Sequence, residues 1–521
     1  MGETGNMERI ETNRRDFLKG TLWMGATAAL AGCVSSAAKL CGPGKMTGFA
    51  VAPIKTVRVG VIGLGMRGPG AVHRLATIPG VQVAALCDLF PERVAIQQQW
   101  LADNGKPRAL GEYSGEEGWK ALCESDLDLV YIATPWALHT PMALYAMEHG
   151  KHVAIEVPSA MYLDECWALV ETAERTGRHC MQLENCCYGE VEMLTLNLVR
   201  QGKLGEIVHG EGAYIHDLRE LNFRDLNLLE PERSGYQGYW RLKWNMRHFG
   251  NPYPTHGLLP IMQAMNVNRG DRLDYLTCVS SAQVGMDAYA KAMFDKDSPK
   301  ADCHPRCGDM STTVVRTVKG RTIMVQHDVT SARPYSRINL VSGTMGCLCD
   351  YPPRVALAGR PGDGAHYWFN FTKQEAEKIL GRKLDEYWRW RISRVEDDRL
   401  AAEYYERVLE EYRHPLWKVA GALAQKMGGH GGMDFLMDLR LCYCLQNGLP
   451  LDMDVYDLAA SCSLCELTER SALNRGEPQE IPDFTRGGWE TATPLGIESV
   501  DLDKLGISLD DVSADKTQLN V

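Results

Sequence analysis

Apolar and polar positions near residue 57 alternate in the pattern of a βαβ unit. The run VRVGVI (57–62) is typical of a buried strand, and the glycines that follow it lead into the helical stretch AVHRLATIPG. Further strands are predicted at VQVAALCD (81–88), DLDLVYIATP (126–135) and KHVAIEV (151–157). Strands that alternate with helices indicate a parallel sheet covered on both faces, which is a doubly wound α/β fold.

The C-terminal half carries mostly helical patterns. Residues 381–420 place aromatic side chains at helical spacing among many charges, which favours a solvated helix face with a packing seam. Residues 433–450 and the following segment VYDLAASCSLCELTERSAL predict two apolar helices that pack back on the core. The residues after 490 are acidic and weakly patterned, and we expect a docked tail.

Composition limits the class of protein. The chain has 521 residues, of which 45% are hydrophobic and 24% charged, an ordinary globular balance for two or three domains. Its net charge is −11, and it contains no basic run. Because nucleic-acid affinity depends largely on neutralising phosphates, we expect no nucleic-acid partner.

The first 33 residues have the form of an export signal. NRRDFLKG (13–20) resembles a twin-arginine signal, and the apolar stretch after it is shorter than the roughly 20 residues that a membrane span needs. LAGC (30–33) resembles a bacterial lipobox, so Cys33 is the expected lipid anchor; cleavage by an ordinary signal peptidase, leaving a soluble protein, is the alternative. We expect a bacterial periplasmic protein or membrane-anchored lipoprotein that contacts the membrane only through that lipid. Residues 34–54 then read as a flexible linker.

The twin-arginine route exports folded proteins and suits those that acquire a cofactor in the cytoplasm. The signal therefore predicts a tightly held cofactor. The 17 cysteines do not point to a metal, because several lie inside apolar runs and buried free cysteine behaves as a small hydrophobe. Cys462 and Cys465 form one C-x-x-C without a second pair, so no metal site is expected, while Cys303 and Cys307 are placed to bridge a loop.

A dinucleotide-binding motif follows the first strand. Gly63, Gly65 and Gly68 form G-x-G-x-x-G between a strand and a helix, and Asp88 ends the next strand twenty residues later. The glycines allow a pyrophosphate to approach the helix N-terminus. Asp88 is suited to bind both ribose hydroxyls and would repel a 2′-phosphate, which favours NAD over NADP. Glu156 also lies at a strand end, where the nicotinamide is expected.

The sequence resembles the Gfo/Idh/MocA family in the segments GLGMRG (63–68), TPWALHTPMALYAMEHGKHVAIEVP (134–158) and GKLGEIVHGEGAY (202–214). This resemblance implies an N-terminal Rossmann domain followed by an α/β domain with an open, largely antiparallel sheet. It also implies a lysine after the strand-end glutamate and an aspartate four residues before the catalytic histidine in a dehydrogenase. Here Val157 replaces that lysine, and the aspartate is missing.

These departures resemble the NAD-dependent glycosidases of glycoside hydrolase family 109, typified by α-N-acetylgalactosaminidase. The further matching segments are ENCCYG (184–189), AYIHDLRE (213–220), YWRLKW (239–244), NPYPTHG (251–257), SARPYSR (331–337) and GGHGGMDF (428–435). Leu259 stands where glycine is expected, and the segment 222–238 is longer than expected. We expect both departures near the substrate, where they would affect sugar specificity.

The resemblance implies a reaction and a set of residues. The expected reaction is retaining hydrolysis by transient C3 oxidation with bound NAD+, C2 deprotonation, elimination, water addition and re-reduction. The residues expected to bind NAD are Gly63, Gly65, Met66, Arg67, Gly68, Asp88, Trp136, His139, Glu156, Val157 and Asn185. Those expected to hold the glycan substrate are Tyr214, Arg241, Tyr253, Pro254, Thr255, His256 and Tyr335. Tyr253 and His256 are expected to transfer protons, with the C2 base left open between them.

Two other functions remain open from the sequence. A sugar dehydrogenase of the same fold would accumulate NADH, and a non-catalytic carbohydrate-binding lipoprotein would bind sugar without turnover. An open sheet also favours a homo-oligomer. The expected organisation is a signal at 1–33, a linker at 34–54, a Rossmann domain at 55–178, a substrate domain at 179–490 and a tail at 491–521.

Overall fold

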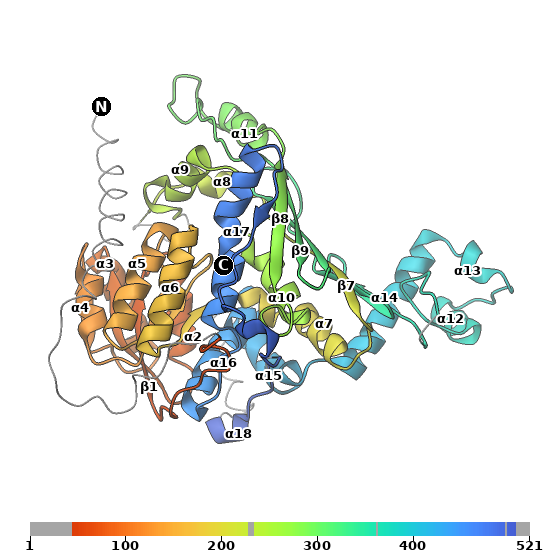
Figure 1. Ribbon diagram of the computed structural model, residues 1–521, viewed down its shortest axis with the longest axis horizontal. Helices are drawn as coiled ribbons and strands as arrows, with labels where there is room; N and C mark the ends of the chain where they lie inside the picture. The colour runs from red at the N-terminus through yellow and green to blue at the C-terminus, as the bar shows by residue number, and fades with distance from the viewer. Residues whose placement is uncertain (1–43, 228–233, 361–362, 495–496, 507–521) are drawn as a thin grey trace.

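The computed structural model describes residues 44–227, 234–360, 363–494 and 497–506. Its first sheet has six parallel strands in the order β3-β2-β1-β4-β5-β6. The part of the chain that contains this sheet is coloured red to orange in Figure 1. The strands are β1 (Val57–Ile62), β2 (Val81–Asp88), β3 (Gly111–Ser114), β4 (Leu129–Ile132), β5 (His152–Ile155) and β6 (Cys180–Gln182). This order is that of a Rossmann sheet and confirms the predicted fold class. Because β6 belongs to it, the sheet continues beyond the expected boundary at residue 178.

Helices cover both faces of this sheet. They are α2 (Gly68–Leu75), α3 (Pro91–Asp103), α4 (Gly118–Glu124), α5 (Trp136–Glu148) and α6 (Leu163–Thr176). The residues of β4 and β5 are all buried, which explains why both strands read as unbroken apolar runs.

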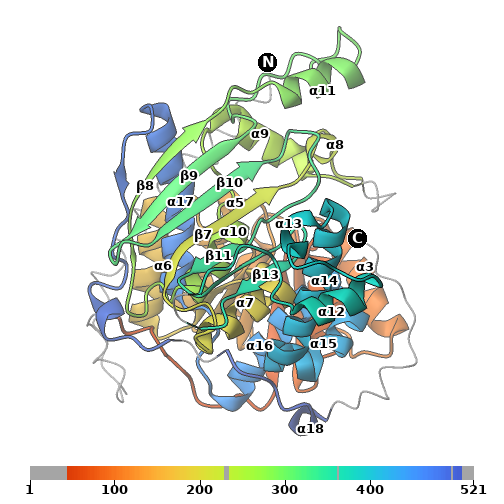
Figure 2. The ribbon, with the colours of Figure 1, turned by 90° about the vertical axis from the view of Figure 1, so that its right-hand side faces the viewer.

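The second sheet has eight strands in the order β13-β12-β11-β7-β10-β9-β8-β14 (Figure 2). Its described pairings are antiparallel except that of β7 with β10, which confirms the expected open, largely antiparallel sheet. The strands are β7 (Ile207–Ile215), β8 (Leu273–Ser280), β9 (Ser311–Thr317), β10 (Thr322–Asp328), β11 (Leu340–Gly343), β12 (Gly346–Cys349), β13 (Arg354–Leu357) and β14 (Gln479–Glu480).

A pair of glycines brings helix α10 (Thr255–Ala264) against β7. A Cβ atom on Gly212 of β7 would lie 1.9 Å from the carbonyl oxygen of Gly257 on α10, and one on Gly257 would lie 2.3 Å from the nitrogen of Ala213. Only glycine permits this approach. It places the first turn of α10, with Thr255 and His256, beside the C-terminal end of β7.

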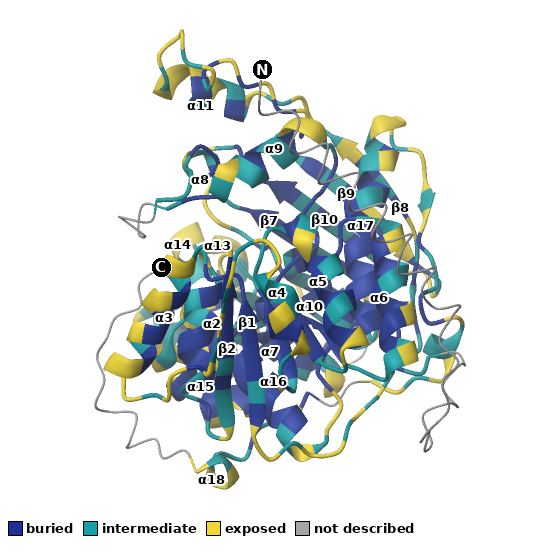
Figure 3. Ribbon diagram, turned by 90° about the vertical axis from the view of Figure 1, so that its left-hand side faces the viewer, coloured by how far each residue is buried: buried dark blue, intermediate teal, exposed yellow. Residues whose placement is uncertain are grey.

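The two predicted apolar C-terminal helices are present, and they connect the domains. Helix α16 (Met433–Asn447) packs on α2 and β1 of the Rossmann sheet, whereas α17 (Val455–Leu473) packs on both α6 and β8. Figure 3 shows α16 and α17 as largely buried. Because α16 lies on the Rossmann sheet, the residues that form this half of the molecule are not contiguous in sequence.

The structure describes several further helices. They are η3 (Asn185–Tyr188), α7 (Glu190–Arg200), α8 (Arg219–Asn222), η5 (Gln237–Tyr239), α9 (Trp240–Arg247), α11 (Gly285–Met293), α12 (Lys373–Leu380), α13 (Trp388–Arg391), α14 (Arg394–Tyr412), α15 (Pro415–Met427), η6 (His430–Gly432), η7 (Gly488–Glu490) and α18 (Leu502–Leu505). No helix within the described ranges is both long and apolar enough to cross a membrane.

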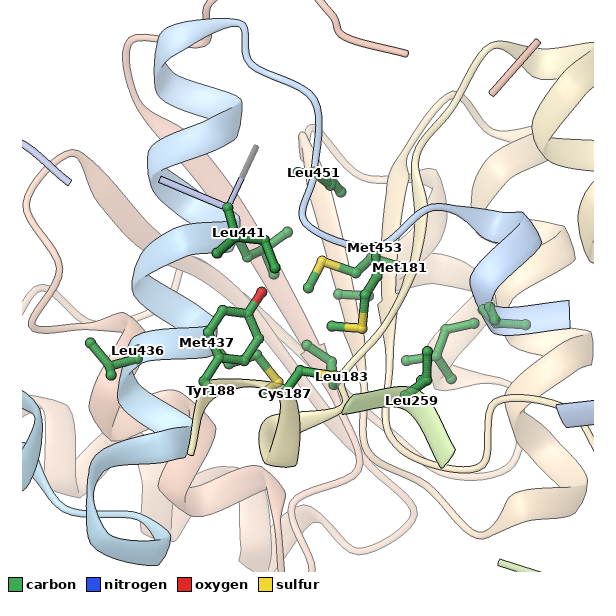
Figure 4. Close-up of a cluster of buried hydrophobic side chains, with 14 of the residues drawn as sticks. Met181, Leu183, Cys187, Tyr188, Leu259, Leu436, Met437, Leu441, Leu451 and Met453 are labelled. Atoms are coloured by element: carbon green, nitrogen blue, oxygen red, sulfur yellow. The ribbon is translucent and has the colours of Figure 1, made fainter. Parts of the chain in front are cut away.

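The structure corrects two expectations. Residues 44–54 are not a free tether, because the amide of Met46 donates to the hydroxyl of Tyr456 and that of Ile54 to the carbonyl of Leu445. Leu259 does not line the substrate region: it is fully buried in the apolar cluster of Figure 4, with Met181 and Leu183.

Other expectations fall partly or wholly outside the described residues. The expected signal at 1–33, with Cys33, lies outside the described residues. Residues 228–233 of the segment 222–238 also lie outside them. The tail docks through the described residues Ile497 and Val500, which are buried. Cys303 and Cys307, whose spacing would allow a loop disulfide, are both buried free thiols.

Candidate active site

Two glycines of the turn after β1 have no room for a Cβ atom. Gly63 has a φ of +91°, and a Cβ there would lie 2.6 Å from the carbonyl oxygen of Ala133. A Cβ on Gly68 would lie 1.9 Å from the carbonyl oxygen of Gly63. Such a turn leaves the N-terminus of α2 open to a pyrophosphate, so the local geometry fits a dinucleotide.

Asp88 is fixed at the end of β2. Its Oδ2 accepts a hydrogen bond from the amide of Leu64 at 2.7 Å, and its Oδ1 accepts one from the amide of Phe90 at 3.0 Å. The geometry agrees with its expected role toward a ribose. Sequence reasoning missed Arg93 of α3, whose Nη1 lies 3.5 Å from Asp88 Oδ1 and 3.5 Å from the position of a Cβ on Gly65. Its position in the first turn after the strand-end acid was the available signal.

Glu156 faces Arg67. The Arg67 Nε donates to Glu156 Oε1 at 3.0 Å, and its Nη1 donates to Asp434 Oδ2 at 3.1 Å. Burial opposes the charge on Arg67, but the two carboxylates outweigh it and raise its pKa well above the ordinary value. The strand-end carboxylate is therefore a counter-ion for the arginine of the glycine-rich turn.

Asp434 at the start of α16 connects two predicted cofactor residues. Besides binding Arg67, its Oδ1 accepts a 2.6 Å hydrogen bond from Nδ2 of Asn185. Arg67, Arg74 and His430 all contribute to lowering its pKa well below the ordinary value despite its burial. Sequence reasoning missed Asp434, although GGHGGMDF contains it; no pattern in the chain links it to a turn more than 360 residues earlier.

The other predicted nicotinamide residues surround the ends of β4 and β5. His139 is buried, with Nε2 2.6 Å from the carbonyl oxygen of Thr134 and Nδ1 2.8 Å from that of Pro158. Burial lowers its pKa. The ring therefore ties the two strand ends together. Trp136 and Val157 are buried in one apolar cluster with Tyr214 and Tyr253, and Met66 is 45% exposed.

Three predicted substrate residues meet at the C-terminal end of β7. The ring centroids of Tyr214 and Tyr253 are 4.6 Å apart, and the His256 ring lies 5.3 Å from Tyr214 and 4.9 Å from Tyr253. Pro254 and Thr255 connect Tyr253 to His256 and begin α10. Tyr335 joins the edge of this group, 6.3 Å from the Tyr214 ring. The structure thus brings together residues from three separate motifs.

Arg241 of α9 lies in a box of aromatic rings. Its guanidinium carbon is between 5.0 and 5.8 Å from the ring centroids of Trp136, Tyr214, Tyr236 and Tyr253. Nη1 donates to the hydroxyl of Tyr236 at 2.9 Å, whereas Nη2 is buried without a partner among the described residues. A buried guanidinium with an unused donor is suited to bind an oxygen of a ligand.

His256 has a carboxylate partner that sequence reasoning missed. Its Nδ1 lies 2.6 Å from Oε1 of Glu184, which is fully buried and also accepts a hydrogen bond from the amide of Cys186 at 3.1 Å. Glu184, Cys186 and His256 offer metal-ligand atoms within 4.8 Å of one another. The carboxylate of Glu184 and the imidazole of His256 already bind each other at 2.6 Å. We therefore interpret this group as a hydrogen-bonded pair.

Burial also determines the protonation of the surrounding rings. It raises the pKa of Tyr214 to about 12, partly offset by Arg241, and that of Tyr253 well above the ordinary value. Both phenols are therefore protonated at neutral pH. Burial together with Arg241 lowers the pKa of His216 to about 4, so its imidazole is neutral there.

Comparison with known proteins assigns families to both parts of the chain. Residues 57–183 match the oxidoreductase family with an NAD-binding Rossmann fold. Residues 188–390 and 393–491 match the C-terminal domain of glycosyl hydrolase 109. The cofactor of the chain is therefore NAD, in agreement with the geometry of the glycine-rich turn and Asp88.

Relatives and solved structures agree with this assignment. A glycosyl hydrolase family 109 protein of Shewanella amazonensis is 44% identical over 93% of this chain and 99% of its own length. A Bacteroides fragilis protein named alpha-N-acetylgalactosaminidase is 46% identical over 85% of this chain and 95% of its own. A levoglucosan dehydrogenase with NADH and levoglucosan has a TM-score of 0.56 at 17% identity, covering 82% of this chain and all of its own, and shows the shared fold. The chain is a glycoside hydrolase and belongs to glycosyl hydrolase family 109.

Proposed function

We propose that this enzyme releases terminal α-linked N-acetylgalactosamine, or a closely related sugar, with retention of configuration and with NAD regenerated in each turnover. The name of the Bacteroides fragilis relative supports the sugar. The observation that carries the mechanism is the environment of the carboxylates beside Tyr253. Glu184 is bound to His256 and Glu156 to Arg67.

Direct glycoside hydrolysis uses two carboxyl groups, one as acid and one as nucleophile or base. Glu156 and Glu184 are both buried and both engaged by basic side chains, so neither is free for that role. Among the described groups beside Tyr253, we assign proton transfer to Nε2 of His256 and to the phenol of Tyr253. This supports a route in which removal of a C–H proton, rather than attack by a carboxylate, initiates cleavage of the glycosidic bond.

The cofactor and the side chains divide the proposed chemistry. When bound, NAD+ supplies a hydride acceptor for C3 of the sugar and later returns that hydride. A ketone at C3 acidifies the proton at C2. His256 takes that proton through Nε2, since Nδ1 is occupied by Glu184. Tyr253, protonated because burial raises its pKa, donates to the leaving glycosidic oxygen.

Arg241 and the aromatic rings orient the sugar in this proposal. The unpaired Nη2 of Arg241 is the donor that we assign to an oxygen of the sugar, such as the carbonyl of the 2-acetamido group. Val157 adds no proton donor beside the nicotinamide, which fits a reaction with no net redox change.

The test uses protein purified with its own cofactor, an aryl α-N-acetylgalactosaminide and D2O. NMR of the released sugar should show deuterium at C2, and the absorbance at 340 nm should show no accumulation of NADH. Accumulated NADH would instead identify a dehydrogenase. Sugar binding without release would support the carbohydrate-binding function.

We also propose export by the twin-arginine route, with lipid attachment at Cys33. The residue pattern at 13–20 and 30–33 supports this. Replacing Arg14 and Arg15 by lysine should retain the protein in the cytoplasm, and C33A should move it from the membrane fraction to the soluble one. Unchanged fractionation of the Arg14 and Arg15 variant would contradict export by the twin-arginine route. Unchanged fractionation of C33A would contradict lipid attachment.

A further inference from the structure

Glu184 lies at a buried position, where an ionised side chain is energetically costly. It follows strand β6 and caps the short helix η3, where its side chain accepts a hydrogen bond from the Cys186 amide. The residue has no exposed surface. A single backbone hydrogen bond does not offset the cost of burying a carboxylate, and a neutral acceptor would satisfy the same amide.

The charge of Glu184 is directed at His256. Burial disfavours the ionised form of Glu184, but the charge of His256 and its hydrogen bond outweigh burial and lower the pKa of the carboxyl. An ionised carboxylate only accepts hydrogen bonds, so the 2.6 Å contact requires a hydrogen on Nδ1 of His256. In the neutral imidazole, Nε2 then carries the lone pair.

We propose that Glu184 is a positioning residue that fixes His256 in the tautomer with a basic Nε2 and stabilises the imidazolium that forms when the proton is taken. This inference rests on the proposed function, in which His256 removes the C2 proton. In that step the C2–H bond breaks, and its electron pair converts the C3 ketone into an enolate. A new N–H bond forms at Nε2 of His256. Glu184 remains ionised, the proton on Nε2 exchanges with solvent, and His256 then delivers a proton to C2 when water has added at C1.

The other charged and titratable groups around this pair do not replace Glu184. Tyr214 and Tyr253 are protonated phenols, His216 is neutral, and the Cys186 thiol has a pKa raised by burial. Arg337, which lies near Cys186, is bound by Glu192 at 2.7 Å. Within the described ranges, Glu184 is the acidic residue that contacts His256.

The decisive variant is E184Q. Glutamine keeps the size of the side chain and accepts from Nδ1–H, but it removes the charge. We expect NAD content and KM to change less than about threefold and kcat to fall by about 100-fold. The deuterium isotope effect from a C2-labelled sugar should increase relative to that from a C3-labelled sugar, because only proton removal is slowed. A general loss of folded enzyme would leave the ratio of the two isotope effects unchanged.

A matched control comes from another buried glutamate. Glu165 is also almost fully buried, and its carboxylate accepts hydrogen bonds from the amides of Met161 and Tyr162. E165Q should keep both the isotope-effect ratio and kcat near their original values. Equal changes in E165Q and E184Q would overturn the inference. E184D keeps the negative charge on a side chain that is one methylene shorter. It should recover part of the activity lost in E184Q.

A second readout does not depend on glycosidase activity. Diethyl pyrocarbonate modifies neutral imidazole, and mass spectrometry of the His256 peptide can follow this modification as a function of pH. Loss of the carboxylate should shift the onset of His256 modification, and the acid limb of kcat/KM, to lower pH in E184Q. An unshifted onset would overturn the role of Glu184 even if the sugar is hydrolysed. If the onset shifts in E184Q but the unaltered enzyme releases no labelled sugar, the interaction between Glu184 and His256 stands and only the proposed function is refuted.

Discussion

At the scale of single residues, the proposed proton transfer depends on a few contacts around His256. Its ring lies edge-on to both Tyr253 and Tyr214, and its Nδ1 binds Glu184. Among the described residues, no hydrogen bond, ion pair or ring contact joins His256 or Tyr253 to the glycine-rich turn that fits the dinucleotide. Chemistry and cofactor retention are therefore expected to respond to different substitutions.

Tyr253→Phe and His256→Ala should each reduce turnover of an aryl α-N-acetylgalactosaminide by at least about 100-fold, since each removes a proton-transfer group. The amount of NAD released on denaturation of each variant should match that of the unaltered protein. Steady-state kinetics and NAD quantification check the two halves of this expectation. Full activity in H256A would remove His256 from the mechanism.

At the scale of elements, α16 holds the cofactor turn from a distance in sequence. In D434N, Arg67 loses an ionic partner and Asn185 faces a neutral amide. Hydrogen bonds to charged groups contribute about 1.5–3 kcal/mol, so NAD affinity should weaken by about 10- to 100-fold. The measurement is NAD per chain after extensive dialysis. D438N is the matched control, because Asp438 lies one turn further along α16 and binds Arg74 and Tyr131 instead; equal NAD loss in both variants would contradict this account.

Helix α10 carries His256 on its first turn and Leu259 in the core. Leu259→Ala should lower the free energy of unfolding by about 2–5 kcal/mol, because it leaves a cavity in a fully buried cluster. The ratio of kcat/KM values for different aryl glycosides should not change, since Leu259 does not line the substrate region. Denaturant unfolding and a substrate panel test this pair of outcomes. V279A is a suitable control, because Val279 is 65% exposed on the sheet. A changed substrate preference in L259A would return Leu259 to the specificity determinants.

At the scale of the whole molecule, stability at low pH depends on buried neutral histidines. Burial first, and then His152 and Arg178, lower the pKa of His179 to about 3. In the unfolded chain a histidine has a pKa of about 6.5, so the unfolded state binds the proton first. The contribution of His179 is therefore present above pH 6.5 and is lost as the pH falls toward 3.

His179→Phe should make the free energy of unfolding less dependent on pH in this window, by up to about 1.4 kcal/mol per pH unit. Phenylalanine retains ring contacts of the kind that His179 makes with Phe49 and His152. Urea unfolding at a series of pH values provides the slope. R333A, an exposed substitution, should keep the original slope. An H179F slope equal to that of the unaltered protein would show that His179 is protonated before unfolding.

The sequence predicted those parts of the fold and site that depend on neighbours along the chain. The strand patterns and the spacing from Gly63 to Asp88 indicated the Rossmann unit, because strand, turn and helix N-terminus are local structures. The segment NPYPTHG placed Tyr253 and His256 in one turn for the same reason. Expectations about positions without such a local pattern were wrong in two cases. Leu259 was expected near the substrate but lies in the core. Residues 44–54 were expected to be a tether but are bound to the folded part of the chain.

Tertiary structure alone decided which charges face each other. Glu184 and His256 are 72 residues apart, and Arg67 and Asp434 are 367 residues apart. Burying an ion is favourable only where an opposite charge approaches from another element, and periodicity carries no information about that element. The sequence by itself thus determined the nucleotide fold and the cofactor, and it predicted Tyr253 and His256 as the proton-transfer pair. The crossing of α10 over β7 and of α16 over the Rossmann sheet determined the partners of His256 and Arg67.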